Sequence, residues 1–216
     1  QPIWTTKAET AFRLRGRIEA ILGWATTAGY RTGDNPARWQ GHLENLLAGG
    51  RAGRIKNQPS LPYQQVGAFM AALRTREGVS ARALEFAILT AARSGEVRGA
   101  TWSEFDLQAG IWTVPADRMK AGRAHQVPLS AAALAILKKM DQQSAFVFPN
   151  SNDGQLSDAA LSATVKRMND PTVTWIDPTG KRPVVPHGFR STFRMWAAEA
   201  TNYPRDVAEH ALAHKL

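Results

Sequence analysis

A short run of small and basic residues, Ala48-Gly49-Gly50-Arg51-Ala52-Gly53-Arg54, divides the chain into two parts of unequal length. Glycine and alanine carry no side chain that could anchor this run to a core, and arginine favours solvent. We therefore expect a small N-terminal piece over residues 1–48, a linker over 49–60 and a larger domain over 61–216. A chain of 216 residues has room for one ordinary domain and a small second one.

The segment before the linker has the pattern of an amphipathic helix. Apolar residues recur at helical spacing from Phe12 to Ala25, and Gly29 is a typical helix end. Arg13, Arg15 and Arg17 stand between the apolar residues and predict a basic flank. Asp34-Asn35-Pro36 has the composition of a capped helix start, which predicts a second helix with its leucines on one face. This segment is either a separate helical domain or a helical hairpin packed on the larger domain.

The segment after the linker predicts a mainly α fold with a small antiparallel β-sheet. Two β-prone runs, Gly110–Pro115 and His125–Leu129, flank a basic turn that carries Lys120. The proline-rich stretch 172–186 predicts a loop or hairpin ahead of a helix that begins near His187. Helical spacing and capping residues predict further helices over 66–73, 84–91, 131–140 and 158–168.

The charge of the chain is consistent with a partner made of phosphate. Its formal net charge is +9, and its isoelectric point is about 10.3. This basicity is typical of nucleic-acid-binding proteins, although a cationic surface can also serve solubility alone. Cysteine is absent, which excludes disulfides and thiolate metal sites. Since no apolar run approaches membrane-spanning length and no signal peptide opens the sequence, we expect a soluble intracellular protein.

Three separated motifs place cations where a phosphodiester could be held: Ala91-Ala92-Arg93-Ser94-Gly95-Glu96, Met119-Lys120-Ala121-Gly122-Arg123 and His187-Gly188-Phe189-Arg190. In-line attack on a phosphodiester concentrates negative charge on its non-bridging oxygens, so the site needs permanent cations. Arginine fits this task because it keeps its proton and can bond two oxygens at once. Arg93 and Arg190 are therefore the candidate phosphate clamp, although most arginines in such a basic chain lie on the surface without a special role.

Taken together, these motifs resemble the active-site signature of the tyrosine recombinases, most closely that of the phage-type integrases of prophages and genomic islands. The resemblance runs from about Ala11 to the last residue. It implies the catalytic fold of these DNA breaking and rejoining enzymes, preceded by the C-terminal part of a helical core-binding domain. It also implies site-specific DNA recombination, the integration or excision of a mobile element, through a 3′-phosphotyrosine intermediate in the full-length protein.

The resemblance assigns catalytic roles to five residues, and a sixth receives a supporting role. Arg93 and Arg190 would grip the scissile phosphate, and Lys120 would protonate the leaving 5′ oxygen. His187, one helical turn from Arg190, and His214 would contact the phosphate or relay a proton. Glu96 would support Arg93 rather than act as a general base.

Other residues receive lesser roles. Arg118 and Arg123 are candidate DNA-backbone contacts, as are Arg13 and Arg17 in the N-terminal piece; Lys120 and Arg123 could also be simple phosphate contacts beside the site. His210 and His214 have the spacing of a helical metal pair. Because no glutamate of the metalloprotease pattern and no third ligand accompanies them, we expect no metal and no cofactor.

The nucleophile is the missing part of the signature. The three tyrosines, Tyr30, Tyr63 and Tyr203, all precede His214, whereas the nucleophile of this family follows that histidine. Tyr203 predicts a loop residue that packs on or caps the next helix. We therefore expect a C-terminally truncated integrase that binds DNA but forms no covalent adduct, because an oriented nucleophile supplies much of the barrier reduction.

The resemblance also implies partners. These are double-stranded DNA at attachment sites, three further copies of the protein in a tetramer on DNA, a directionality factor and a host DNA-bending protein, in the nucleoid of a bacterial cytoplasm and without a membrane. Two alternatives stay open: a non-catalytic DNA-binding regulator of the same fold, and an enzyme similar to the type IB topoisomerases, which share the phosphate chemistry.

Overall fold

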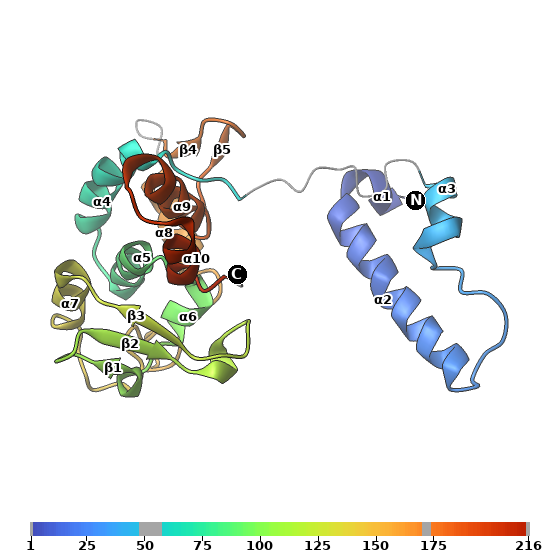
Figure 1. Ribbon diagram of the computed structural model, residues 1–216, viewed down its shortest axis with the longest axis horizontal. Helices are drawn as coiled ribbons and strands as arrows, with labels where there is room; N and C mark the ends of the chain where they lie inside the picture. Colours follow the sequence, from blue (N-terminus) through green and yellow to red (C-terminus); the bar gives the residue numbers. More distant parts are fainter. Residues whose placement is uncertain (1, 48–57, 170–173, 215–216) are drawn as a thin grey trace. The chain divides into compact units, whose positions relative to one another are not determined.

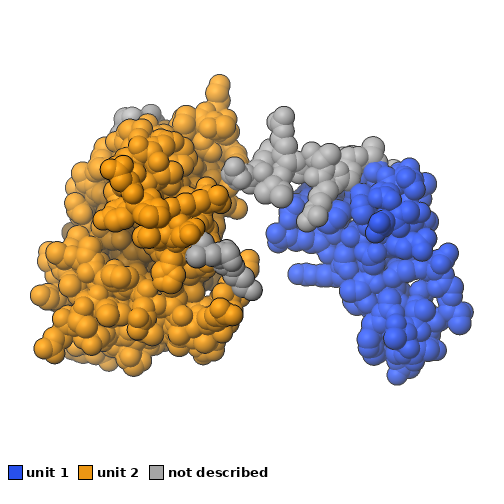
Figure 2. Space-filling view, in the orientation of Figure 1, with its two compact units in different colours: residues 1–57 blue, residues 58–216 orange. Residues whose placement is uncertain are grey.

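The computed structural model describes residues 2–47, 58–169 and 174–214 and contains two compact units, residues 1–57 and 58–216 (Figures 1 and 2). Each unit is described by itself. Most of the expected linker, and the glycine-rich run within it, lies outside the described residues.

The first unit is built around one long helix. A short helix, α1 (Pro2–Thr6), leads into α2 (Ala8–Thr27), which confirms the predicted amphipathic helix but begins earlier than its first apolar residue. Gly29 follows the helix end with a φ of 78°, a conformation that glycine adopts without strain.

The prediction of a helix starting at Pro36 is wrong. An irregular turn, η1 (Trp39–Leu43), and a short helix, α3 (Glu44–Leu46), follow instead, and Gly41 with a φ of 70° interrupts the helical path. The Asn35 side chain explains the difference, because it joins the loop to α2. Its Nδ2 donates to the Glu19 carbonyl at 2.8 Å, while its Oδ1 accepts from the Ala37 backbone at 3.0 Å.

Aromatic rings pack against one another in the first unit. The ring centroids of Trp4 and Trp39 lie 5.7 Å apart, and Phe12 meets Trp39 edge-on at 5.4 Å. The guanidinium of Arg15 lies 4.8 Å from the Phe12 centroid and donates to the Ala37 carbonyl at 2.8 Å. Arg15 therefore belongs to the packing of this unit rather than to its basic flank.

The second unit is mainly helical with a small antiparallel sheet at one side, as predicted (Figure 1). Helix α5 (Val79–Thr90) packs against α4 (Val66–Arg74), α7 (Ala131–Leu137) and α8 (Ala160–Met168). The sheet has the order β1-β2-β3. The remaining elements are η2 (Tyr63–Gln65), α6 (Ser94–Arg98), η3 (Trp102–Glu104), η4 (Ala116–Arg118), α9 (Gly188–Ala200) and α10 (Arg205–Ala211).

The strands largely confirm the sequence pattern. Strands β2 (Ile111–Val114) and β3 (His125–Pro128) pair antiparallel, with Val114 opposite His125. Strand β1 (Phe105–Asp106), which was not predicted, pairs with β2. The proline-rich stretch contains a hairpin of β4 (Ile176–Asp177) and β5 (Arg182–Pro183).

Two predicted helices keep their place but are shorter. Helix α7 ends at Leu137 rather than at Met140, while the Ser130 hydroxyl accepts from the Ala133 backbone at 3.3 Å as its predicted cap. Helix α8 begins at Ala160.

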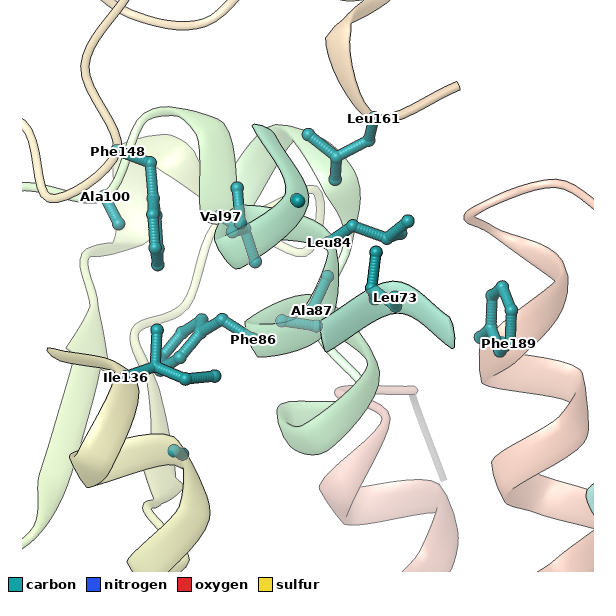
Figure 3. Packing of buried hydrophobic residues seen from close by; sticks show 14 of the residues in the cluster. Leu73, Leu84, Phe86, Ala87, Val97, Ala100, Ile136, Phe148, Leu161 and Phe189 are labelled. Atoms are coloured by element: carbon teal, nitrogen blue, oxygen red, sulfur yellow. The ribbon is translucent and has the colours of Figure 1, made fainter. Parts of the chain in front are cut away.

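The core lies where α5 faces the sheet. Phe86 is fully buried, and its ring centroid lies 5.5 Å from those of both Trp112 and Phe148. Figure 3 shows Phe86 between Ile136 and Phe148, with Leu84 and Leu73 continuing the core towards Phe189. These contacts fix the helices and the sheet from which the polar residues described below project.

The start of the second unit is attached to α9. The Thr192 hydroxyl donates to the Leu61 carbonyl at 2.6 Å, and the Val185 backbone donates to the Pro59 carbonyl at 3.3 Å. A Cβ atom at Gly188 would lie 1.9 Å from the Pro59 oxygen. Glycine is therefore required at the first position of α9, between His187 and Phe189.

Among the described residues, no helix combines the length and the apolar character needed to cross a lipid bilayer.

Candidate active site

Arg93 lies at the junction of two helices. Helix α5 ends with Ala91 in a left-handed conformation (φ 51°), and Arg93 is the residue that precedes α6. Glu96, in the first turn of α6, accepts from the Arg93 backbone N–H at 2.9 Å with Oε2 and from its Nη1 at 2.7 Å with Oε1. The side chain of Glu96 is 6% exposed. One buried carboxylate thus fixes both the backbone and the guanidinium of Arg93.

Arg190 comes from the first turn of α9 and is only 6% exposed. Its Nη1 donates to the Ala91 carbonyl, and its Nη2 donates to the Leu212 carbonyl at 2.6 Å. Burial, together with the charge of Arg93, lowers the pKa of Arg190 from its ordinary value to about 10, although Glu96 opposes this effect. The protein therefore keeps a desolvated cation beside a second cation.

Two alanines in left-handed conformations supply carbonyls to the arginine pair. Ala91 (φ 51°) follows α5, and its carbonyl accepts from Arg190. Ala213 (φ 49°) lies just beyond α10, and its carbonyl accepts from Arg93 Nη2 at 3.4 Å. Since non-glycine residues pay about 1 kcal/mol or more for this conformation, the turns are features that the surrounding contacts must maintain.

His187 lies close to the other charged residues of the site. It precedes α9, and partial desolvation of its ring lowers its pKa below the ordinary value of 6.5. Repulsion by Arg190, Arg93, His214 and Lys120, in that order, lowers it further. These four residues are thus within electrostatic range of His187, and we call the five residues together the cation cluster.

Lys120 is the exposed member of the cation cluster. It lies in the turn between η4 and β3, and no hydrogen bond or ion pair holds its side chain within the part of the chain that is described. Arg123, on the same turn, is also exposed. Both side chains can therefore reach a ligand without giving up an internal partner. An open groove beside them is lined by Met119, Arg123, His125, His210, Ala213 and His214.

His214 is held by a residue that the motifs did not identify. Its Nδ1 lies 2.6 Å from Glu209 Oε2, and its Nε2 lies 3.3 Å from Arg190 Nη2. Glu209, on α10, also accepts from Arg194 Nε at 2.7 Å. The hydrogen bond to His214, followed by that to Arg194, lowers the pKa of Glu209 to about 2. A carboxylate on the same helical segment as an active-site histidine was the sequence signal that could have suggested this contact.

The structure gives Arg118 internal partners instead of a free guanidinium. It forms an ion pair with Glu104 and donates to the backbone carbonyl of Glu96. Each of its two terminal nitrogens thus has one internal acceptor, and the contact of Arg118 with the DNA backbone stays a prediction. The carboxylate of Glu104 also accepts from Trp112 Nε1 at 2.8 Å, which joins Arg118 to the sheet.

The arginines expected to contact DNA in the first unit lie on the surface of α2. Arg13 pairs with Glu9 at 2.8 Å in an exposed position, where such pairs contribute little to stability. Arg17 is exposed and makes no hydrogen bond or ion pair within the described residues.

Tyr203 lies in the loop before α10, as predicted, and is 67% exposed. Pro204 rather than Tyr203 directly precedes α10, and Tyr203 lines a surface hollow with Arg205 and Ala208 of that helix. The rings of His210 and His125 meet edge-on with centroids 5.8 Å apart. Within the described ranges, no three histidine, aspartate or glutamate side chains gather in a way that could hold a metal ion.

A buried arginine beside a second arginine, with two histidines and a lysine around them, defines a site for an oxygen-rich anion such as a phosphodiester. Comparison with known proteins agrees. The chain belongs to the phage integrase family: the Phage integrase family matches residues 59–216, and the phage integrase central domain matches residues 1–42.

Individual relatives are phage and prophage integrases. The integrase of Enterobacteria phage P4 is 28% identical over 227 residues, which cover 96% of this chain and 48% of the phage protein. The prophage integrase IntA of Escherichia coli strain K12 is 36% identical over 166 residues, which cover 74% of this chain and 38% of IntA. The chain thus spans about half the length or less of these two relatives.

Solved structures share the fold. A lambda integrase tetramer bound to a Holliday junction matches with a TM-score of 0.68 and 19% sequence identity. The match covers 99% of this chain and 61% of the lambda integrase chain. At this level of identity the similarity establishes the fold alone.

Proposed function

We propose that this chain is the DNA-binding and phosphate-activating part of an integrase that recombines DNA at specific sites to integrate or excise a mobile element. The observation that carries the proposal is the convergence of four cations on His187. The residue before α6, one from α9, one from the β2–β3 turn and one after α10 lower the pKa of this imidazole, so all four lie near it. An anion placed there would relieve the repulsion among them.

In this proposal each side chain acts on one phosphate. Arg93 and Arg190 donate to the non-bridging oxygens, with spare N–H groups that the internal carbonyls leave open. Lys120, on its exposed turn, donates a proton to the leaving 5′ oxygen. His187 and His214 donate to the same phosphate or relay protons, and Glu96 keeps Arg93 in place.

The attacking group is proposed to be a tyrosine of the full-length protein, which forms a 3′-phosphotyrosine and conserves the energy of the broken bond. No cofactor or metal takes part in this scheme. Of the tyrosines in the printed sequence, Tyr203 lines a different hollow, together with Arg205, Ala208 and Arg194. We therefore do not assign it as the nucleophile.

The partners belong to the same proposal. Double-stranded DNA at attachment sites is the substrate, and the lambda integrase structure supports a tetramer on a Holliday junction as the working assembly. Residues 1–48 would form part of a core-binding domain, with 49–60 as the linker and 61–216 as the catalytic domain, and Arg13, Arg17 and Arg123 would contact the DNA backbone. A directionality factor, a host DNA-bending protein and a place in the bacterial nucleoid complete the scheme.

The proposal is tested first by anion binding at the arginine pair and then by recombination activity. A sulfate ion soaked into crystals should lie between the guanidinium groups of Arg93 and Arg190, close to His187. The full-length protein should then exchange flanks between two marked attachment sites, and the Arg93→Lys variant should not. Relaxation of supercoiled DNA without exchange would instead indicate a topoisomerase, and binding without cleavage would indicate a regulator.

A further inference from the structure

We propose that Glu209 is a positioning residue of the cation cluster, whose carboxylate holds His214 Nδ1 so that Nε2 faces Arg190 and the phosphate bound there. This inference rests on the proposed function and extends it. The motifs that carry the resemblance do not include Glu209, and the comparisons assign it no role.

Glu209 is well placed for this task because both of its oxygens are engaged. The residue is 8% exposed; Oε2 lies 2.6 Å from His214 Nδ1, and Oε1 accepts from Arg194 Nε at 2.7 Å. Arg205 adds a longer contact to Oε1 at 3.7 Å. The carboxylate is therefore held between α9 and the end of α10, and it has little freedom to release the imidazole.

His214 is attached to Glu209 twice. Besides the side-chain contact, the backbone N–H of His214 donates to the Glu209 carbonyl at 3.0 Å. This double attachment fixes the position of the Cα atom and one edge of the ring. The remaining freedom, rotation about the side-chain bonds, is what the carboxylate removes.

The contact also selects a tautomer. An ionised carboxylate only accepts hydrogen bonds, so the proton of a neutral His214 must reside on Nδ1. Nε2 then carries a lone pair and faces Arg190 Nη2, a donor, at 3.3 Å. When His214 takes up a second proton, Nε2 can donate to a phosphate oxygen while Glu209 compensates the charge on the ring. Carboxylates that orient metal-bound histidines act by the same principle.

A purely structural ion pair makes a different prediction. If Glu209 only joined α9 to α10 through Arg194, its removal would lower stability and leave the tautomer of His214 unchanged. The tautomer therefore separates the two roles.

The experiment is nuclear magnetic resonance on the 216-residue chain with ¹⁵N-labelled histidine, with the His214 signals assigned from the His214→Gln variant. Wild type should show Nδ1 as the protonated nitrogen. Glu209→Gln keeps an acceptor oxygen without its charge and should retain this tautomer in part, whereas Glu209→Ala should shift His214 towards the Nε2–H form. Glu199→Gln, an equal charge change at an exposed position of α9, is the matched control and should behave as wild type.

Titration with inorganic phosphate links the tautomer to the site. Glu209→Gln should bind phosphate about tenfold more weakly than wild type, the loss expected for one charge-assisted hydrogen bond. A His214 tautomer that is unchanged in both Glu209 variants would overturn the proposal, and the Gln variant alone suffices if the Ala variant does not fold. If the tautomer shifts as expected but phosphate moves no resonance of the cation cluster, the positioning role is supported and the proposed function is contradicted.

Discussion

Replacement of Arg190 by methionine should abolish phosphate binding at little cost in stability, because two effects on folding oppose each other. The variant leaves the Ala91 and Leu212 carbonyls without their arginine donor. Each buried carbonyl that loses its donor costs about 1–3 kcal/mol. Methionine also removes a charge that the fold keeps under electrostatic strain, since folding lowers the pKa of Arg190 from its ordinary value to about 10. At about 1.4 kcal/mol per pKa unit, that strain amounts to about 3 kcal/mol.

The sign of the second effect follows from linkage. A cation with a lowered pKa is disfavoured in the folded state, so the penalty is present in full at every pH well below 10. It disappears only as the pH rises from about 10 towards the ordinary pKa of arginine, where the unfolded chain also loses the proton. At neutral pH the relief offsets much of the carbonyl cost, and Arg190→Met should lower the free energy of unfolding by at most about 3 kcal/mol.

Urea denaturation followed by circular dichroism measures this difference. Phe86→Ala is a suitable reference, because Phe86 is fully buried and such truncations cost about 3–5 kcal/mol. Titration with phosphate and with duplex DNA measures the effect on ligand affinity, and Arg190→Met should lose detectable phosphate binding. If Arg190→Met were less stable than Phe86→Ala, or if it bound phosphate like wild type, the view of Arg190 as a strained ligand-binding cation would be wrong.

Three further predictions concern charge. DNA affinity should fall on the order of 10³-fold or more between about 50 and 200 mM salt if roughly six phosphates are contacted; a flat response would refute DNA tracking by the basic surface. Arg118→Met should destabilise the second unit by about 3 kcal/mol, because it leaves the carboxylate of Glu104 (7% exposed) without its cation. Arg123→Met should keep the stability of wild type and lower by about 1 the slope of log DNA affinity against log salt concentration. Thermal melts and binding isotherms distinguish the two variants. Because the pKa of His187 lies below 6.5 in the folded state, its contribution to stability is complete above that pH and is lost as the pH falls through the lower value. Thermal melts from about pH 8 to about pH 5 should therefore show a smaller loss of stability in acid for His187→Asn than for wild type. Part of the loss should remain, because desolvation and the nearby His210 also lower the pKa of His125.

The sequence predicted best those features that depend on neighbours along the chain. The β-prone runs Gly110–Pro115 and His125–Leu129, with a basic turn between them, were enough to predict the hairpin that carries Lys120. The start of α9 near His187 followed from the proline-rich stretch ahead of it. In both cases the residues that determine the element are also the residues that form it.

Features that depend on distant partners were not predictable. Arg118 and Arg123 look alike in sequence, and only the approach of Glu104 and of the Glu96 carbonyl distinguishes an internal ion pair from an exposed cation. Asn35 has the composition of a helix cap, yet its side chain reaches back to α2. Glu209 stands close to His214 in the sequence, but its role depends on the orientation of His214, which the fold of the last helices sets.

The carbonyls of Ala91 and Ala213 give the arginine pair a counter-charge that is not an ion. Helix C-termini carry partial negative charge, and these two carbonyls lie just past the ends of α5 and α10. The immobilisation of an arginine side chain costs about 1.5–2 kcal/mol of rotamer entropy. Since Arg93 and Arg190 are held in the folded chain, that ordering is complete before any ligand arrives. The entropy cost of ordering the two arginine side chains therefore does not reduce their affinity for an incoming phosphate. The phosphate meets donors that already point in fixed directions.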